Sequence, residues 1–205
     1  MRAENLLNYR QLDDAIDNVR MMMGGKRLYH VLGVMEFAVS LALREGVDVE
    51  KAATAALLHD CAKALKPQAI EEEMASYGEE IPDEDRPFPG TWHALLGAVR
   101  AQRQFGINDP EILDAIRFHP TSDADASALT KILFVSDILE PTRCYARADS
   151  LRLLARQSFE KAYREAVLSK TGYLKNDEEK SLHPRAIRAL SSLGVSSLTD
   201  GVQSS

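Results

Sequence analysis

The stretch that decides the fold is Ala55-Ala56-Leu57-Leu58-His59-Asp60-Cys61-Ala62-Lys63. Small and aliphatic residues at helical spacing predict a helix with one buried face here, from Asp48 as its N-cap to about Leu65. His59 and Asp60 interrupt that face. Burying a carboxylate without a partner costs several kcal/mol, so Asp60 needs a cation, and His59 beside it offers a second ligand. The stretch therefore predicts a metal site inside a helical protein.

Length and composition predict an all-α, single-domain protein. A chain of 205 residues suits one hydrophobic core. Leucine and alanine dominate and runs of β-branched residues are scarce, which favours helix. No internal repeat or break in composition marks a second domain, so we expect one helical domain over residues 1–193 and a frayed polar tail over residues 194–205.

Charge and hydropathy argue against two classes of partner. The formal net charge is −6 with both signs interspersed, so no positive field favours nucleic acid. No run approaches the roughly 18 uncharged apolar residues of a spanning helix, and residues 1–5 lack the apolar core of a signal peptide. Cys61 and Cys144 have no disulfide-like or metal-like spacing and are interpreted as reduced thiols. We expect a cytoplasmic protein that binds neither nucleic acid nor membrane.

The other helices are predicted from the same periodicity and from their caps. Asp109, Thr91 and Ser127 are candidate N-caps, and Gly46 and Gly106 are candidate C-terminal glycines. The helices are expected at residues 8–23, 26–45, 67–77, 92–105, 109–119, 127–140, 148–169 and 184–193. The acidic segment 79–90, which holds three prolines, is either a lid or a linkage.

Histidines fall on or beside the inward faces of four different predicted helices. They are His30, His59, His93 and His119, and Asp60 and Asp137 join them. Any one of these histidines alone is more often a satisfied, partly buried residue than a ligand. Together, six such groups in one core would leave several polar groups buried without partners unless they held metal ions. His183, before Pro184, lies outside this order and is expected to cap or pack at a helix start.

The order and wording of these motifs resemble those of the HD-domain metal-dependent phosphohydrolases, and within them the YqeK family of symmetrical bis(5′-nucleosyl)-tetraphosphatases. The matching stretches, spread between about Tyr9 and Leu193, are RLYHV (27–31), ALLHDCAK (56–63), WHALLGA (92–98), IRFH (116–119), KILFVSDILEPTR (131–143) and LHP (182–184). After His119 the family usually reads Thr-Thr-Gly, where this chain has Pro120-Thr121-Ser122-Asp123. This departure leaves the metal ligands untouched and puts substrate contacts from that loop in doubt.

The resemblance implies a two-metal site in which Asp60 bridges the ions. His30, His59 and Asp137 would complete the shell of one ion, and His93 and His119 would hold the other. Mixed imidazole and carboxylate ligands suit iron, manganese, cobalt, nickel or zinc better than calcium or magnesium, and the resemblance favours iron. The nucleophile would be a water or hydroxide shared by the ions, so neither a serine nor Cys61 is needed for catalysis.

Phosphoryl transfer also requires cations beside the metal ions, because negative charge gathers on the phosphoryl oxygens. Lys63 lies one turn after His59, Arg27 lies one turn before His30, and Arg143 follows the helix of Asp137. Each of the three is alternatively a solvated surface charge. We assign catalytic roles to Asp60, Lys63, Arg27 and Arg143, and substrate binding to Arg27, Lys63, Thr121 and Arg143.

The resemblance implies symmetrical cleavage of diadenosine tetraphosphate into two ADP, so the expected partner is a small nucleotide. Two alternatives stay open: another HD-type nucleotide phosphatase or phosphodiesterase, and a nucleotide-binding protein without catalytic activity. The sequence leaves the oligomeric state undetermined and is compatible with a homodimer.

Overall fold

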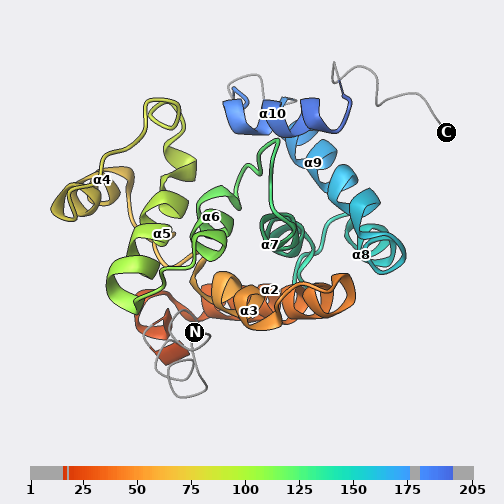
Figure 1. Cartoon of the computed structure of the whole chain (residues 1–205), viewed down its shortest axis with the longest axis horizontal. Coiled ribbons are helices and arrows are strands. Elements are labelled where there is room, and N and C mark those ends of the chain that lie inside the picture. Colours follow the sequence, from red (N-terminus) through yellow and green to blue (C-terminus); the bar gives the residue numbers. More distant parts are fainter. Residues whose placement is uncertain (1–15, 18, 176–180, 196–205) are drawn as a thin grey trace.

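Helices run through most of the residues that the computed structural model describes, which are 16–17, 19–175 and 181–195 (Figure 1). The helices are α2 (Gly25–Glu45), α3 (Val49–Leu58), α4 (Pro67–Ser76), a 3-10 turn η1 (Pro89–Thr91), α5 (Trp92–Phe105), α6 (Pro110–Phe118), α7 (Ala128–Leu139), α8 (Ala148–Gln157), α9 (Phe159–Lys175) and α10 (Pro184–Ser192). These residues include no strand, and the prediction of an all-α single domain is confirmed. Of the helix expected over residues 8–23, the described positions 16–17 and 19–22 are helical, whereas residues 8–15 lie outside the described part, as does the tail from 196.

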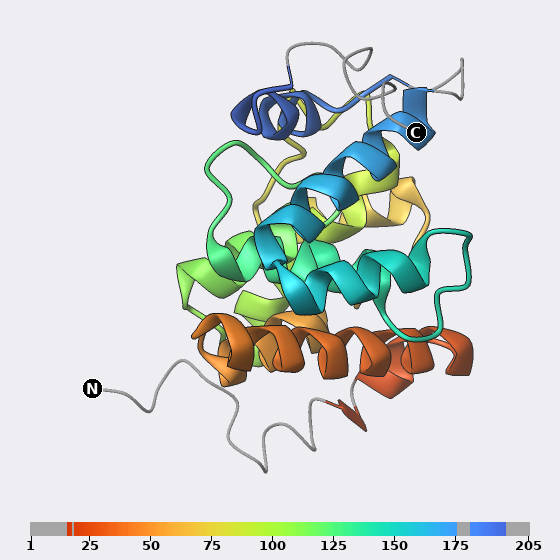
Figure 2. The ribbon, with the colours of Figure 1, turned by 90° about the vertical axis from the view of Figure 1, so that its right-hand side faces the viewer.

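Helix α7 occupies the centre of the domain because its side chains are apolar on almost every side. Leu129, Ile132, Leu133, Phe134 and Val135 are all buried. A helix that is apolar all round is stable only when other elements surround it. Helices α2, α3, α6, α8 and α9 pack against α7, which Figure 1 shows nearly end-on. Helices α2 and α10 lie on opposite sides of the domain (Figure 2).

Small residues let the helices beside α3 come close to it. Ala52, Ala55 and Ala56 of α3 are buried. Gly97 of α5 faces the end of α3, where a Cβ atom would lie 3.3 Å from the carbonyl oxygen of His59. Because a side chain would be tight at this position, glycine lets α5 pass directly beside the His59-Asp60 pair.

Helix α3 is shorter than the sequence predicts, since it ends at Leu58 rather than near Leu65. His59 Nδ1 lies 2.6 Å from the carbonyl oxygen of Ala56, which a continuing helix would offer to the N–H of Asp60. The chain then proceeds in tight turns as far as Ala64. His59 and Asp60 therefore stand at a helix end and not within a helix.

The long helix expected over residues 148–169 is two helices, α8 and α9, which pack against each other. Ser158 between them is extended, with φ −157° and ψ 103°. Apolar spacing continues across this junction, since Ala155 and Phe159 are both buried and four residues apart, so periodicity alone did not indicate the break. The break lets both segments bury their apolar faces, and α9 continues to Lys175.

The acidic segment 79–90 is fastened to the start of α10. The carboxylate of Asp85, which is fully buried, pairs with His183 at 3.1 Å and with Arg185. His183 also caps α10, because its side chain accepts a hydrogen bond from the N–H of Arg185. Separately, none of the described helices has the length and apolar character needed to span a membrane.

Candidate metal centre

Asp60 lies between two pairs of histidines, and each of its carboxylate oxygens faces a different pair. Asp60 Oδ2 is 3.8 Å from His30 Nε2 and 3.7 Å from His59 Nε2. Asp60 Oδ1 is 3.3 Å from His93 Nε2 and 3.7 Å from His119 Nε2. All five side chains are buried. The geometry is that of two three-residue groups sharing one carboxylate, and either group can hold a metal ion.

Helix ends orient two of the four imidazoles. His59 follows α3 and His119 follows α6, and each directs Nδ1 at a backbone carbonyl three residues earlier, Ala56 O at 2.6 Å and Ile116 O at 2.8 Å. A carbonyl only accepts, so Nδ1 carries the proton and donates, which satisfies an acceptor left over at the helix end. The lone pair of Nε2 is thereby directed at Asp60, the tautomer that a metal ligand needs.

The other two histidines come from within α2 and from the first turn of α5. His30 Nδ1 donates to Glu140 Oε1 at 3.1 Å, and its Nε2 is 3.2 Å from Asp137 Oδ1. His93 Nε2 lies 3.1 Å from Lys63 Nζ. Asp137 thus borders His30, although it belongs to neither of the three-residue groups around Asp60.

The protonation states and the unsatisfied nitrogens fit divalent metal ions. Among the described residues, none forms a hydrogen bond with the buried Nε2 atoms of His30 and His59, although Asp137 Oδ1 lies 3.2 Å from the Nε2 atom of His30. Burial lowers the pKa of His59 and the pKa of His93 to about 4, so both rings are neutral at neutral pH. Burial raises the pKa of Asp60, but charge and hydrogen bonds from the surrounding histidines outweigh it and hold the pKa well below its usual range. Burial also lowers the pKa of His30, but the neighbouring carboxylates of Asp137 and Glu140 outweigh it and leave the pKa raised. A metal ion binds neutral imidazole and ionised carboxylate, so His59, His93 and Asp60 are already in the state that binds metal, whereas His30 would first give up any proton on Nε2.

The three candidate cations lie at this cluster. Arg27 Nη1 is 2.8 Å from Asp60 Oδ2, and Arg143 Nη2 is 3.1 Å from Asp137 Oδ1. Lys63 approaches His93, and burial is the main cause that lowers the pKa of Lys63. The side chains of Arg27 and Arg143 are 39% and 43% exposed, so their guanidinium groups remain accessible to a ligand.

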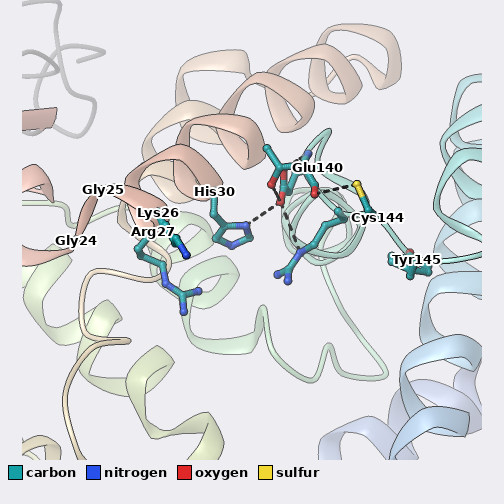
Figure 3. Close-up of a pocket in the computed structure, with 10 residues that line it drawn as sticks. Gly24, Gly25, Lys26, Arg27, His30, Glu140, Cys144 and Tyr145 are labelled. Atoms are coloured by element: carbon teal, nitrogen blue, oxygen red, sulfur yellow. Dashed lines mark hydrogen bonds and ion pairs between the residues drawn. The ribbon is translucent and has the colours of Figure 1, made fainter.

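Two cavities open beside the cluster. One, of about 840 Å³, is lined by Arg27, His30 and Arg143 (Figure 3). The other, of about 650 Å³, is lined by Lys63 and Thr121 together with apolar side chains of α7, α9 and segment 87–91. The hydroxyl of Thr121 donates to the carbonyl of Ser122 rather than into this cavity. The unusual loop after His119 therefore forms part of the wall of this cavity. The hydroxyl of Thr121, the residue predicted to bind substrate from this loop, is already hydrogen-bonded within the loop.

Two charged residues of the site were not predicted from the sequence, Glu140 and Lys170. Glu140 is buried against His30, across 110 residues of sequence, so no local pattern indicated it. Lys170 lines the 650 Å³ cavity with Lys63, and burial lowers its pKa. A signal for Lys170 existed: it follows Ala162 and Ala166 at steps of four, on the buried face of α9.

All the predicted metal ligands lie within a segment of the chain that matches a known protein family. A family model described as HD domain matches residues 27–154, which contain all six predicted metal ligands. A Bacillus subtilis protein named symmetrical bis(5′-nucleosyl)-tetraphosphatase is 34% identical over 76% of this chain and 83% of its own. A protein of the same name from Halalkalibacterium halodurans is 32% identical over 69% of this chain and 75% of its own.

A solved structure resembles the whole domain. It is that of a predicted HD superfamily hydrolase involved in NAD metabolism from Clostridium acetobutylicum, with a TM-score of 0.80 and 36% sequence identity. The match covers 88% of this chain and 95% of that chain. The fold is therefore shared over most of this chain and nearly all of the other.

Proposed function

The chain belongs to the HD-domain family, and from that premise we propose that it hydrolyses dinucleoside polyphosphates, cleaving diadenosine tetraphosphate symmetrically into two ADP. The observation that carries the proposal is Asp60, whose two oxygens face different histidine pairs. A carboxylate so placed can serve two cations at once, as two-metal phosphohydrolysis requires. The names of the relatives from Bacillus subtilis and Halalkalibacterium halodurans support the choice of substrate.

We assign the six ligands to two ions that share Asp60. One ion would be held by His30, His59 and Asp137, and the other by His93 and His119. When bound, the ions supply an activated water and positive charge for the phosphoryl oxygens. Histidine and carboxylate ligands suit iron, manganese, cobalt, nickel or zinc, and iron is the metal we propose.

The basic side chains at the cluster would bind the polyphosphate. Arg27 and Arg143 border the larger cavity and Lys63 borders the smaller one, so cations stand on both sides of the metal ligands. A dinucleoside polyphosphate has a nucleoside at each end and its anionic chain in the middle. The two cavities give room for the two ends, while the cations between them neutralise the chain.

Product analysis tests this proposal. Protein purified without oxygen and supplied with iron, manganese or cobalt is incubated with diadenosine tetraphosphate, and the nucleotides are separated by chromatography. Two ADP as the products support the proposal, whereas ATP with AMP overturns symmetrical cleavage. Turnover of nucleoside monophosphates with the dinucleotide untouched favours another HD-type phosphatase. Tight nucleotide binding without turnover under all three metals favours a binding protein.

Arg143→Ala is expected to lower kcat/KM by about 10- to 100-fold while both ions stay bound, because the guanidinium serves the phosphoryl oxygens and is not a ligand. Steady-state kinetics and metal analysis on the same sample check this. The matched control is Arg147→Ala, which removes an arginine that is 61% exposed and paired with Glu165. Loss of metal in parallel with activity would instead show that Arg143 acts by holding Asp137, which it contacts.

Location and assembly belong to the same proposal. A cytoplasmic location is favoured by the two free cysteines, Cys61 and Cys144, since reduced thiols persist in that compartment.

The proposed homodimer would use an apolar face of α2. Tyr29 and Leu43 are both exposed and lie 14 positions apart on this helix, so they share one side of it. Analytical ultracentrifugation decides between monomer and dimer.

A further inference from the structure

Glu140 is a buried carboxylate that takes no ligand position and yet touches the metal centre. It follows α7 as the C-cap residue and is 1% exposed. His30 Nδ1 donates to its Oε1 at 3.1 Å, the backbone N–H of Thr142 donates to its Oε2 at 2.7 Å, and the hydroxyl of Thr142 donates to Oε1 at 2.6 Å. Figure 3 shows the contact between His30 and Glu140 at the wall of the larger cavity. A charge buried this deeply is costly unless it is hydrogen-bonded, so these three hydrogen bonds fix the position of the Glu140 carboxylate.

Helix α2 leaves space for this carboxylate. Gly33 lies three residues after His30, on the same side of the helix. A Cβ atom at Gly33 would lie 2.8 Å from Glu140 Oε2, closer than such atoms approach one another. Glycine is a poor helix former, so its place in the middle of α2 is explained by the room that Glu140 needs.

The partner of His30 differs in charge from those of the other histidines. His59 and His119 donate Nδ1–H to neutral backbone carbonyls. His93 has the ammonium group of Lys63 within 3.4 Å of both ring nitrogens. A carboxylate that accepts from the outer nitrogen fixes the ring and makes the inner nitrogen a stronger metal ligand. A nearby ammonium repels a metal ion, so the two sides of Asp60 are not equivalent.

The charged side chains that stand near His30 differ from those that stand near His93, on the other side of Asp60. On the His30 side stand the carboxylates of Asp137 and Glu140, whose charges are balanced by Arg27 and Arg143. On the other side Lys63 stands beside His93. Asp60 is common to both. Lys170 of α9 also acts on Asp137 through its charge, so the two sides differ in the group that contacts the histidine, a carboxylate at His30 and an ammonium at His93, and not in net charge.

We propose that Glu140 is a positioning residue that fixes His30 toward Asp60 and makes the metal position of His30, His59 and Asp60 the tighter of two unequal positions. This role rests on the metal centre of the proposed function. It assigns Glu140 no contact with substrate. Glu140 changes the metal affinity of the position formed by His30, His59 and Asp60, and it does so through the imidazole ring of His30.

Titration of metal-free protein with Co²⁺, followed by calorimetry and by the visible absorption of the bound ion, tests the proposal. The wild type is expected to bind in two steps. Glu140→Gln keeps the shape but removes the charge, and it is expected to weaken the tighter step by about 10- to 100-fold while leaving the weaker step within about twofold. Glu36→Gln, an exposed glutamate on α2, is the control and should change neither step.

Gly33→Ala provides a second variant with no change of charge. Its added methyl group would displace Glu140, so the same tight step should weaken although alanine favours the helix more than glycine. Gly172→Ala is its control, because a Cβ atom at that position in α9 meets no atom of the described residues within 4 Å. Circular dichroism melting checks that each variant is folded.

The outcomes separate this role from the proposed function. A wild type that binds no Co²⁺ overturns the metal centre itself. Two steps of equal affinity in the wild type, or two unequal steps that Glu140→Gln leaves unchanged, overturn the role of Glu140 and leave the metal centre standing. Equal weakening of both steps in Glu140→Gln shows a general structural effect and also overturns it.

Discussion

Asp60→Ala is expected to abolish hydrolysis and to remove both metal ions. One carboxylate faces all four histidines, Oδ2 toward one pair and Oδ1 toward the other, so its loss takes a ligand from each ion. It also leaves four imidazoles close together, with Asp137 beside His30 as the remaining carboxylate among the predicted ligands. A metal ion contributes several kcal/mol of transition-state stabilisation, and about 1.4 kcal/mol is tenfold in rate, so we expect a fall of roughly a thousandfold or more.

Metal analysis and the chromatographic product assay measure the two effects on the same sample. Asp60→Asn, which keeps the size of the side chain, separates loss of charge from loss of packing. The control is Asp114→Ala, because Asp114 is 47% exposed on α6 and pairs only with Arg117 three residues away among the described residues. Hydrolysis at the wild-type rate, or one ion still bound at full occupancy, would show that the bridging carboxylate lies elsewhere.

Most helix boundaries were predictable because they are set by local chemistry. Asp48, Asp109 and Ser127 accept hydrogen bonds from the first turns of α3, α6 and α7, as predicted. Gly46 and Gly106 end α2 and α5 with φ of 70° and 69°, a conformation that glycine adopts without strain. Thr91 stands before α5 but its hydroxyl donates to Phe88 O, so it is no side-chain cap.

The candidate ligands were predictable because helical spacing shows which side chains face inward. The same reasoning could not show which helix ends meet. Glu140 reaches His30 across 110 residues, and Asp85 reaches His183 across 98. His183 was expected to cap a helix start, which is confirmed, but its bond to Asp85 depends on how segment 79–90 packs against α10. Such contacts depend on how the helices are arranged in space, and the periodicity of the sequence does not predict them.

Asp85→Asn is expected to lower the free energy of unfolding by about 3–5 kcal/mol, the cost of leaving one partner of a buried ion pair without the other. Asp85 is fully buried, and Arg185 and His183 are 4% exposed. With the carboxylate neutralised, the remaining acidic partner of Arg185 among the described residues is Glu84, at 2.7 Å. A glutamate that is 36% exposed compensates poorly for a buried charge. Segment 79–90 would lose its attachment to α10, and with it the wall that residues 87–91 give to the smaller cavity.

Urea unfolding followed by circular dichroism measures the loss, with Asp83→Asn as the control. Asp83 is fully exposed and pairs only with Arg86 among the described residues, so its replacement should leave the free energy of unfolding close to that of the wild type. Asp85→Asn combined with Arg185→Met removes both charges and should be less destabilising than Asp85→Asn alone.

The pH dependence gives an independent check on the same pair. Burial raises the pKa of Asp85, but hydrogen bonds and charge from His183 and Arg185 outweigh it and leave the pKa lowered. A carboxyl group whose pKa is lower in the folded state stabilises the fold above its unfolded pKa, and this contribution is lost as the pH falls through the folded value. The difference in stability between the wild type and Asp85→Asn should therefore shrink below about pH 4. A difference that stays constant from pH 7 to pH 3 would mean that the ionised carboxylate is not what fastens segment 79–90 to α10.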